Sequence, residues 1–401
     1  MLLKTPGSAR TDIDYRLLVP LLLNSTILQT VISVTRITTS YRALELGLSV
    51  VWLGVISATF ALLPVFLAVW VGRFIDRGND APAAWLGSAL VVAGCGGIAF
   101  SDSAEILLAF NAVLGVGHLF VMSSQQMLCV RSAGTSHARE QVFGNYMVSA
   151  AVGQGFGPYV VGWIGGAATI PPTRLLFAVA VGGAVAALLC ALAIPRERMD
   201  RTEKAEGGVV PVRELLRVPG LGAVLMTSII TVTAGDLVII YLPVLGAERG
   251  IDVSVIGLLL TTRAVCSMIA RVLYTRTLMI VGRWRLLVSS TLAGALTFAC
   301  LAAPLPLAAM YVAMACMGLT LGISTTLGIS TVVDLAAAGA RGTVNSLRIM
   351  GNRIGQAAFP FGASLIAAAT GAAGILAMIA IGLAASSAAV HWSRVGRSPA
   401  D

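Results

Sequence analysis

The chain has 401 residues, of which 57% are hydrophobic and only 11% are charged, and its mean hydropathy is +0.90. This composition argues against a soluble globular protein, because its repeated apolar runs match the ~20 residues that a helix needs to cross ~30 Å of hydrocarbon. The formal net charge of +9 could suggest nucleic-acid binding, but the basic residues are distributed as in a membrane protein. We therefore expect an all-α membrane protein and no nucleic-acid partner.

Twelve apolar segments are long enough to span a bilayer, and they are numbered here as spans 1 to 12. They are 17–38, 48–71, 82–101, 104–128, 142–166, 174–194, 219–245, 252–275, 285–303, 306–333, 343–367 and 372–391. The polar stretch 195–218 separates six spans from six, and Gly207, Gly208 and Pro211 within it discourage a continuous helix. The expected organisation is two six-helix bundles, 1–194 and 219–401, joined by a cytoplasmic linker at 195–218.

The polar N-terminus lacks a signal-peptide pattern, so span 1 is expected to be retained. If the N-terminus lies in the cytoplasm, most of the Lys and Arg residues outside the spans lie on the cytoplasmic side. Only three arginines lie on the outer side of the membrane: Arg42, Arg174 and Arg249. This bias predicts an inner (cytoplasmic) membrane protein with both termini in the cytoplasm. The six cysteines lie within spans or at their ends, so neither disulfides nor a metal cluster is expected.

The two halves of the chain repeat each other. Four residues recur 202 positions later and three recur 203 positions later: Arg139, Gly153, Gln154 and Pro158 as Arg341, Gly355, Gln356 and Pro360, and Glu45, Gly47 and Gly54 as Glu248, Gly250 and Gly257. Duplicated halves in an apolar chain are typical of secondary transporters, whose substrate site lies between the halves. A G-x-x-x-x-G-K-[ST] loop is absent, which argues against an ATP-driven pump.

The loop after span 2 reads GRFIDR, and its Gly72, Asp76 and Arg77 resemble the head of the signature loop of the major facilitator superfamily. The loop after span 8 keeps the tail of that signature as Gly282, Arg283, Trp284 and Arg285. The resemblance covers the whole chain and implies two pseudo-symmetric six-helix bundles. It also implies a cytoplasmic latch in which Asp76 meets the start of span 11 near Arg341 or Arg348, helped by the helix dipole. The alternative is a tight turn carrying topogenic charge.

Span 4 departs from the exporters of this family, which usually carry an arginine where this chain has Asn111. One face of the span would suit a cavity wall and presents Asn111, Gly115, His118, Met122 and Gln125. His118 is a candidate proton relay because histidine titrates near neutral pH. The alternative is a hydrogen-bonded packing residue.

Span 5 is similar to the antiporter motif of drug-exporting members. The matching positions are Gly144, Gly153, Gly157, Pro158 and Gly162, whereas Val161 stands where the family usually has glycine. Glycines four apart let helices approach closely, and Pro158 permits a bend, so this span is a candidate for conformational change. Generic small-residue packing is the alternative.

Charged residues inside the spans are the best evidence for a site, since they are costly in the membrane. Arg36 near the outer end of span 1 and Asp236 in span 7 lie 200 positions apart, at nearly equivalent places in the repeats. The resemblance implies that helices 1, 4, 7 and 10 line the cavity, so we expect an Arg36–Asp236 interaction. Three residues precede Arg36 on the same face: Ser25, Gln29 and Ser33.

Further along the chain, Arg263 in span 8 and Asn352 and Arg353 in span 11 are placed near the middle of the membrane. This excess of guanidinium groups favours an anionic substrate, because arginine binds carboxylates bidentately. Arg271 and Arg348 lie closer to the cytoplasmic ends, where they could equally snorkel or belong to the latch.

Asp236 is the expected proton carrier. Desolvation favours its neutral form and a neighbouring arginine favours its charged form, and the sequence leaves the outcome open. In span 10 the polar residues suit a cavity wall or bond back to their own helix: Thr320, Ser324 and Thr331. Asp334 is interpreted as a cap or loop charge.

We conclude from the sequence that the chain is a proton-coupled secondary transporter, not an enzyme, that exports a small organic and often anionic molecule by antiport. Uptake of an organic acid by proton symport is one alternative, and a non-transporting sensor or lipid-assembly factor on the same scaffold is another. The expected partners are the substrate, protons and membrane lipid, with no cofactor and a monomeric state. The candidate substrate residues are Gln29, Arg36, Asn111, His118, Arg263, Asn352 and Arg353, those for protons are Asp236 and His118, and those for gating are Gly72, Asp76, Arg77, Gly153, Gly157, Pro158 and Arg348.

Overall fold

The computed structural model describes residues 13–133, 135–196, 218, 220–335 and 341–395. The first half forms α1 (Tyr15–Glu45), α2 (Val50–Asp76), α3 (Asp80–Ala99), α4 (Ala104–Arg131), α5 (Ser136–Gly165) and α6 (Thr173–Leu192). The second half forms α8 (Leu221–Glu248), α9 (Val253–Val281), α10 (Arg283–Ala302), α11 (Leu307–Leu335) and α12 (Arg341–Val395). The element α12 is two helices that meet at Gly371, which has a φ of +64°.

Counting α12 as two, the described residues form twelve helices that match the twelve predicted spans one for one, which confirms the predicted fold class. Several helices are longer than their spans, and α1 continues to Glu45 where the predicted span ends at 38. Hydropathy marks only the apolar part of a helix, whereas the backbone hydrogen bonds continue into polar end residues. Most of residues 195–218, the predicted linker, lies outside the described part of the chain.

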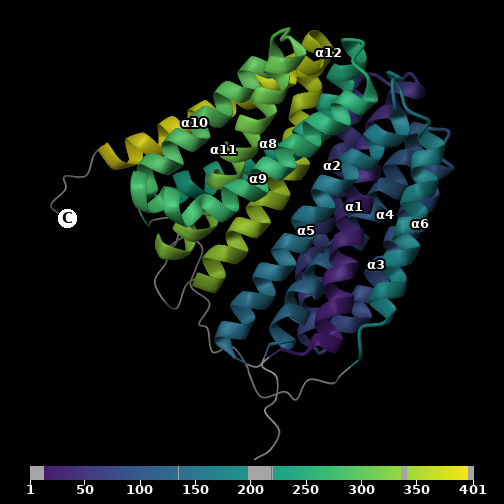
Figure 1. The fold of residues 1–401 in the computed structure, drawn as a ribbon, viewed down its shortest axis with the longest axis vertical. Helices are drawn as coiled ribbons and strands as arrows, with labels where there is room; N and C mark the ends of the chain where they lie inside the picture. Colours follow the sequence, from purple (N-terminus) through teal and green to yellow (C-terminus); the bar gives the residue numbers. More distant parts are fainter. Residues whose placement is uncertain (1–12, 134, 197–217, 219, 336–340, 396–401) are drawn as a thin grey trace, which may run out of the picture.

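Helices α1–α6 and α8–α12 form two bundles that lie side by side, with their axes diverging towards one end (Figure 1). Three helix pairs connect the bundles, namely α1 with α8, α2 with α12 and α5 with α9. At the end where the bundles meet, the N–H of Val253 donates to the carbonyl of Ala168 at 2.9 Å, and that of Ser254 donates to Gly166 at 3.0 Å. These bonds close the molecule at the end opposite the start of α1.

The repeated acids occupy equivalent places in the two bundles. A carboxylate oxygen of Glu45 accepts a hydrogen bond from Thr173, the first residue of α6, at 2.5 Å. Glu248 accepts one from the N–H of Ala372, at the start of the second arm of α12, at 3.4 Å. Each acid therefore stands at the amino end of the sixth helix of its bundle, where the helix dipole favours negative charge. The turns that follow α1 and α8 also match, because Gly47 and Gly250 have φ values of +68° and +65°.

A second equivalent pair links the third and fourth helices of each bundle. Arg131 at the end of α4 contacts both carboxylate oxygens of Asp80 at 2.7 Å, and this pair is buried. In the other bundle Arg283 at the start of α10 pairs with Asp334 near the end of α11. The acid thus lies on the third helix of the first bundle but on the fourth helix of the second, so the two charges are interchanged. Asp334, which the sequence suggested to be a cap or loop charge, is a partner in an ion pair between helices.

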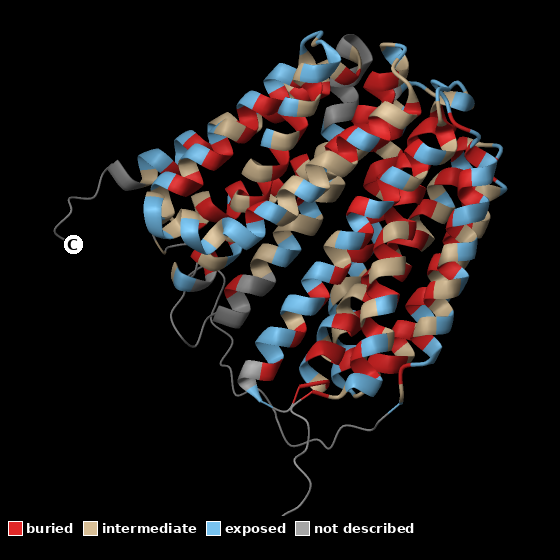
Figure 2. Ribbon diagram, in the orientation of Figure 1, coloured by how far each residue is buried: buried red, intermediate tan, exposed pale blue. Residues whose placement is uncertain are grey.

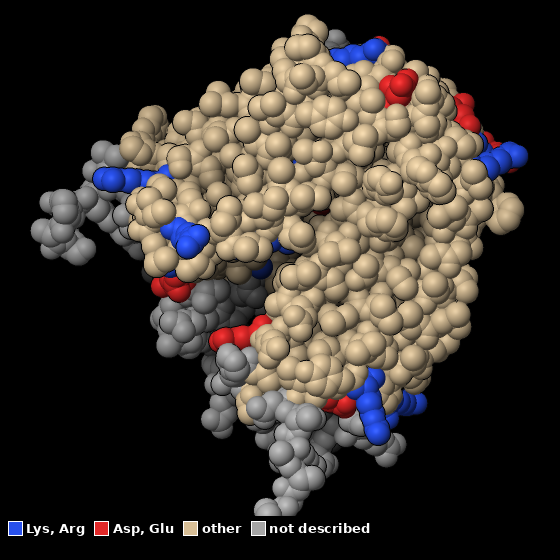
Figure 3. All heavy atoms as spheres, viewed as in Figure 1, with Lys and Arg blue, Asp and Glu red and all other residues tan. Residues whose placement is uncertain are grey.

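The outer surface is apolar, which identifies a multi-pass membrane protein. Ten helices of the described part are long and apolar enough to cross a membrane. Large side chains such as Trp163, Val272 and Ile280 are 76%, 78% and 83% exposed, which suits contact with lipid and not with water. Figure 2 shows such exposed positions along the outward-facing sides of the helices. On the face in Figure 3, charged side chains gather towards the helix ends and in the hollow between the bundles.

Candidate functional site

A cavity of about 410 Å³ lies between the two bundles. Its wall is built from α1, α2, α4 and α5 on one side and from α8, α9, α11 and α12 on the other. Figure 3 shows the molecule hollowed along this boundary. The volume is in the range of small-molecule sites. Spans 1, 4, 7 and 10 line the cavity as expected, and four further helices line it as well.

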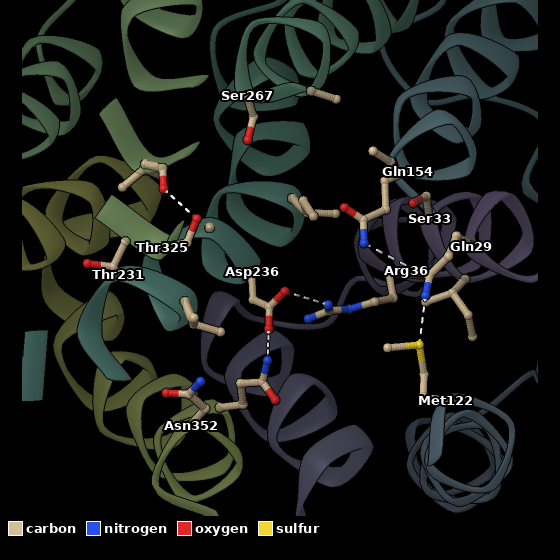
Figure 4. Close-up of a pocket in the computed structure, with 18 of the residues that line it drawn as sticks. Gln29, Ser33, Arg36, Met122, Gln154, Thr231, Asp236, Ser267, Thr325 and Asn352 are labelled. Carbon is tan, nitrogen blue, oxygen red and sulfur yellow. Dashed lines mark hydrogen bonds and ion pairs between the residues drawn. The ribbon is translucent and has the colours of Figure 1, made fainter. Parts of the chain in front are cut away.

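Arg36 and Asp236 form the expected contact across the two bundles. The Arg36 Nη1 lies 3.1 Å from Asp236 Oδ1, and the two side chains are 12% and 25% exposed, so the pair is accessible from the cavity. Gln356 donates to Asp236 Oδ2 at 2.5 Å and accepts from Arg353 at 3.4 Å. Both oxygens of Asp236 therefore have donors, and Figure 4 shows the carboxylate between Arg36 and an amide side chain. Arg36 also lies 5.0 Å from the centre of the Phe60 ring.

The cavity carries a marked excess of positive charge. Five arginines line it, namely Arg36, Arg263, Arg271, Arg348 and Arg353. Asp236 is the only acidic side chain among the described residues of the lining. Four of these arginines come from α9 and α12 of the second bundle. Arg263 and Arg353, which the sequence placed near the middle of the membrane, thus meet at the same cavity.

A chain of neutral polar groups occupies the equivalent wall of the first bundle. Gln154, the repeat counterpart of Gln356, donates to Gln29 at 3.5 Å, and Gln29 donates to the sulfur of Met122 at 3.0 Å. From the sequence, Gln154 and Gln356 serve only as evidence of the duplication and are not predicted as cavity residues. Their recurrence at 202 positions was nevertheless a signal that could have identified both as cavity residues.

Some polar atoms of the lining have no hydrogen-bond partner among the described residues. Both ring nitrogens of His118, the Oδ1 of Asn352 and the Nε of Arg263 are buried in this way. The His118 ring lies 5.5 Å from that of Phe60. Buried polar groups normally have partners, so these atoms are candidates for contact with a ligand.

Several predicted cavity residues lie elsewhere, because only part of each polar face reaches the cavity. Asn111 donates to the carbonyl of Ile56 and to Thr59, so it joins α4 to α2 and does not line the main cavity. Gln125 donates to Asn24 at 2.7 Å within the first bundle. Of the predicted face of span 4, only His118 and Met122 line the cavity. Ser25 is likewise fully buried outside it.

The polar residues named for span 10 do not line the cavity either. Thr320 donates to the carbonyl of Cys316 in its own helix, and Ser324 lies 2.8 Å from Ser290 of α10. Thr331 is buried and does not line the cavity. Thr325, one position beyond Ser324, lines the cavity instead.

The glycines of α5 lie at helix contacts. A Cβ atom on Gly157 would lie 2.5 Å from the Cβ of Ser33, and one on Gly153 would overlap the carbonyl of Thr26, so both face α1. One on Gly162 would lie 3.2 Å from the Cα of Gly257 in α9. Pro158 lies inside α5, and its carbonyl also faces Gly257. The glycines therefore allow close approach both within the first bundle and between bundles.

The expected latch stays a prediction, because the side chain of Arg341 lies outside the described residues. Asp76 and Arg77 are exposed at the end of α2, and Asp76 forms no ion pair with a residue in the described ranges. Arg348 lines the cavity instead, and a Cβ on Gly72 would meet no atom within 4 Å.

The fold, with a cavity between two six-helix bundles, is typical of a membrane transporter. The family model described as Major Facilitator Superfamily matches residues 21–252 and 224–401. The chain therefore belongs to the major facilitator superfamily, and it is a transporter and not an enzyme. Members of this superfamily bind small-molecule substrates. A search of curated proteins finds no match.

Solved structures show the same fold. The nucleoside transporter NupG aligns with a TM-score of 0.78 at 11% identity over 95% of this chain and 100% of its own. The D-xylose-proton symporter aligns with 0.76 at 14% identity over 94% and 97%. A bacterial homolog to the human lysosomal transporter Spinster, inward-facing and occupied, aligns with 0.73 at 15% identity over 96% and 98%. At these identities the likeness concerns the fold alone.

Proposed function

We propose that this transporter exports a small organic anion from the cytoplasm in exchange for protons, by alternating access in the inner membrane. The observation that carries the proposal is the cavity between the bundles, with five arginines and one aspartate. Arginine stays charged and binds carboxylates through two parallel hydrogen bonds. Charged groups inside a membrane protein are costly unless they are paired or used. An anionic substrate would supply negative charge to a lining that has little of its own.

Asp236 would couple the substrate to protons. Its carboxylate holds Arg36 while it is charged, and a proton on Asp236 would remove that attraction. A substrate carboxylate could then take the place of Asp236 at Arg36. Proton and anion bound together in this way would move in the same direction, so this form of coupling supports the second candidate, uptake by symport. His118 is retained as a second candidate for proton relay, because its ring lies in the same cavity.

Movement would occur between bundles 1–194 and 219–401, joined by the linker 195–218. The positive-inside bias supports cytoplasmic termini, and with that orientation the closed end described above would face outward and the cavity would open inward. The glycines of α5 at contacts with α1 and α9 support export, in line with the antiporter-like motif. Uptake by proton symport remains the second candidate, supported by the same arginines.

Transport by the purified chain in proteoliposomes tests this function. We expect accumulation of labelled organic acids in response to a pH gradient, and the sign of the gradient that drives it separates antiport from symport. Arg353→Gln should weaken binding of the acid about tenfold, because it removes a charge-assisted contact. Arg276→Gln, an arginine outside the cavity lining, is the matched control. Tight binding of lipophilic cations together with no binding of organic acids would refute the proposal.

A further inference from the structure

The two walls of the cavity differ in chemistry. Arg263, Arg271 and Arg353 lie on the wall from the second bundle, whereas Phe60, Met122 and His118 lie on the wall from the first. Figure 4 shows Gln29, Met122 and Gln154 on one side of the Arg36–Asp236 pair, and Thr231, Thr325 and Asn352 on the other. Apart from the Arg36–Asp236 pair that joins them, the wall from the second bundle is therefore cationic and the wall from the first is neutral.

Asp236 is the only acidic side chain among the described residues of the cationic wall. Both oxygens of Asp236 are engaged by Arg36 and Gln356. Neither Arg263 nor Arg353 forms an ion pair with a residue in the described ranges. The Nε of Arg263 is also buried without a hydrogen-bond partner there. The guanidinium groups of this wall are therefore suited to bind an acidic group from outside the protein.

The neutral wall combines an apolar surface with unused hydrogen-bonding capacity. The rings of Phe60 and His118 lie 5.5 Å apart, and the thioether of Met122 completes the surface. Neither ring nitrogen of His118 has a partner in the part of the chain that the structure describes. A neutral imidazole offers one donor and one acceptor, so it can bond a single hydroxyl or carbonyl of a ligand. Aromatic groups pack well on such a surface.

We propose that the substrate is a bipolar organic acid, bound with its acidic group at Arg263 and Arg353 and with an aromatic body that carries a hydroxyl against Phe60 and His118. This inference rests on the proposed function, since it takes the cavity as the substrate site. A molecule held in this way touches both bundles at once. It therefore links occupancy of the cavity to the relative position of the bundles.

Four probes separate the two halves of this arrangement in binding measurements on the purified full-length protein. They are 3-(4-hydroxyphenyl)propionate, 3-phenylpropionate, 3-(4-hydroxyphenyl)propanamide and succinate. We expect the hydroxyphenyl acid to bind most tightly. Loss of the hydroxyl and loss of the carboxylate should each weaken binding about tenfold, because each leaves protein groups without a partner. Succinate, which has no aromatic body, should also bind at least about tenfold more weakly.

Two variants assign these losses to the two walls. His118→Phe should weaken the hydroxyphenyl acid about tenfold and leave 3-phenylpropionate unchanged, since only the hydroxyl contact is removed. Arg353→Gln should weaken both acids equally and leave the amide unchanged. His391→Phe, at an exposed position near the end of α12, is the matched control.

The outcomes distinguish this inference from the proposed function. Succinate binding as tightly as the hydroxyphenyl acid, or an equal effect of His118→Phe on both acids, would overturn the bipolar arrangement while the anion transporter stands. Binding of lipophilic cations with no binding of any acid would overturn both. The relative affinities of the four probes for the unmodified chain test the arrangement even if a variant does not fold.

Discussion

Two side chains at nearly equivalent places in the repeats, Arg36 and Asp236, carry opposite charges and meet in the cavity at 3.1 Å. Each half of the chain therefore supplies one member of this ion pair. Gln356 occupies the second oxygen of Asp236, so the protonation state of one carboxylate affects contacts on α1, α8 and α12.

The variant Asp236→Asn keeps the shape of the side chain and removes its titration. We expect it to bind substrate, because Arg36 becomes available to the anion, and to lose transport driven by a pH gradient. The measurement is uptake in proteoliposomes with an imposed pH gradient, beside equilibrium binding in detergent.

Asp252→Asn is the matched control, because Asp252 precedes α9 as its N-cap and asparagine serves that position equally well. It should change neither binding nor transport. A pH-driven rate in Asp236→Asn equal to that of the unmodified chain would move the proton site to another residue.

At the scale of helices, the contact between α5 and α9 depends on backbones that touch. A Cβ on Gly257 would lie 2.5 Å from the carbonyl oxygen of Pro158 and 2.7 Å from the Cα of Gly162. Both are backbone atoms, which cannot rotate away as a side chain can. The close approach at this point therefore requires glycine on both helices.

Gly257→Ala should push α5 and α9 apart and destabilise the conformation that is closed at this end. The expected cost is about 1–3 kcal/mol, as for other overpacked contacts, seen as a lower midpoint of thermal unfolding in detergent. Gly144→Ala in α5 is the control, since a Cβ there would meet no atom within 4 Å. Equal midpoints for the two variants would show that the contact does not limit stability.

At the scale of the whole molecule, the bundles touch through α1–α8, α2–α12 and α5–α9. Alternating access requires that these contacts open on one side of the cavity while others form across it. In this structure the bundles are bonded where α5 ends and diverge at the opposite end.

A cysteine pair placed across the bundles should hold this conformation. The Cβ of Ala264 lies 3.5 Å from the place where a Cβ on Gly155 would stand, within the ~3.5–4.5 Å that a disulfide needs. In a background without the six native cysteines, Gly155→Cys with Ala264→Cys should cross-link on oxidation and stop transport. Reduction should restore it.

Each single-cysteine variant serves as a control and should transport under both conditions. Cross-linking is measured by a mobility shift after proteolysis between the halves, and transport by counterflow in vesicles. Full transport by the cross-linked protein would show that α5 and α9 need not separate at this level.

The sequence by itself determined the twelve helices, the duplication and the Arg36–Asp236 contact. Hydropathy reports which segments lie in lipid, and a repeat maps a residue of one half onto its counterpart in the other. These signals depend on local composition and on spacing along the chain. They need no knowledge of how each helix is rotated about its axis.

Only the tertiary structure decided which polar side chains reach the cavity. Asn111 and Ser324 lie on polar helix faces but bond to neighbouring helices, whereas Thr325 and Gln154 line the cavity. Neighbouring positions on a helix differ by about 100° in direction, so small rotations exchange cavity wall for packing surface.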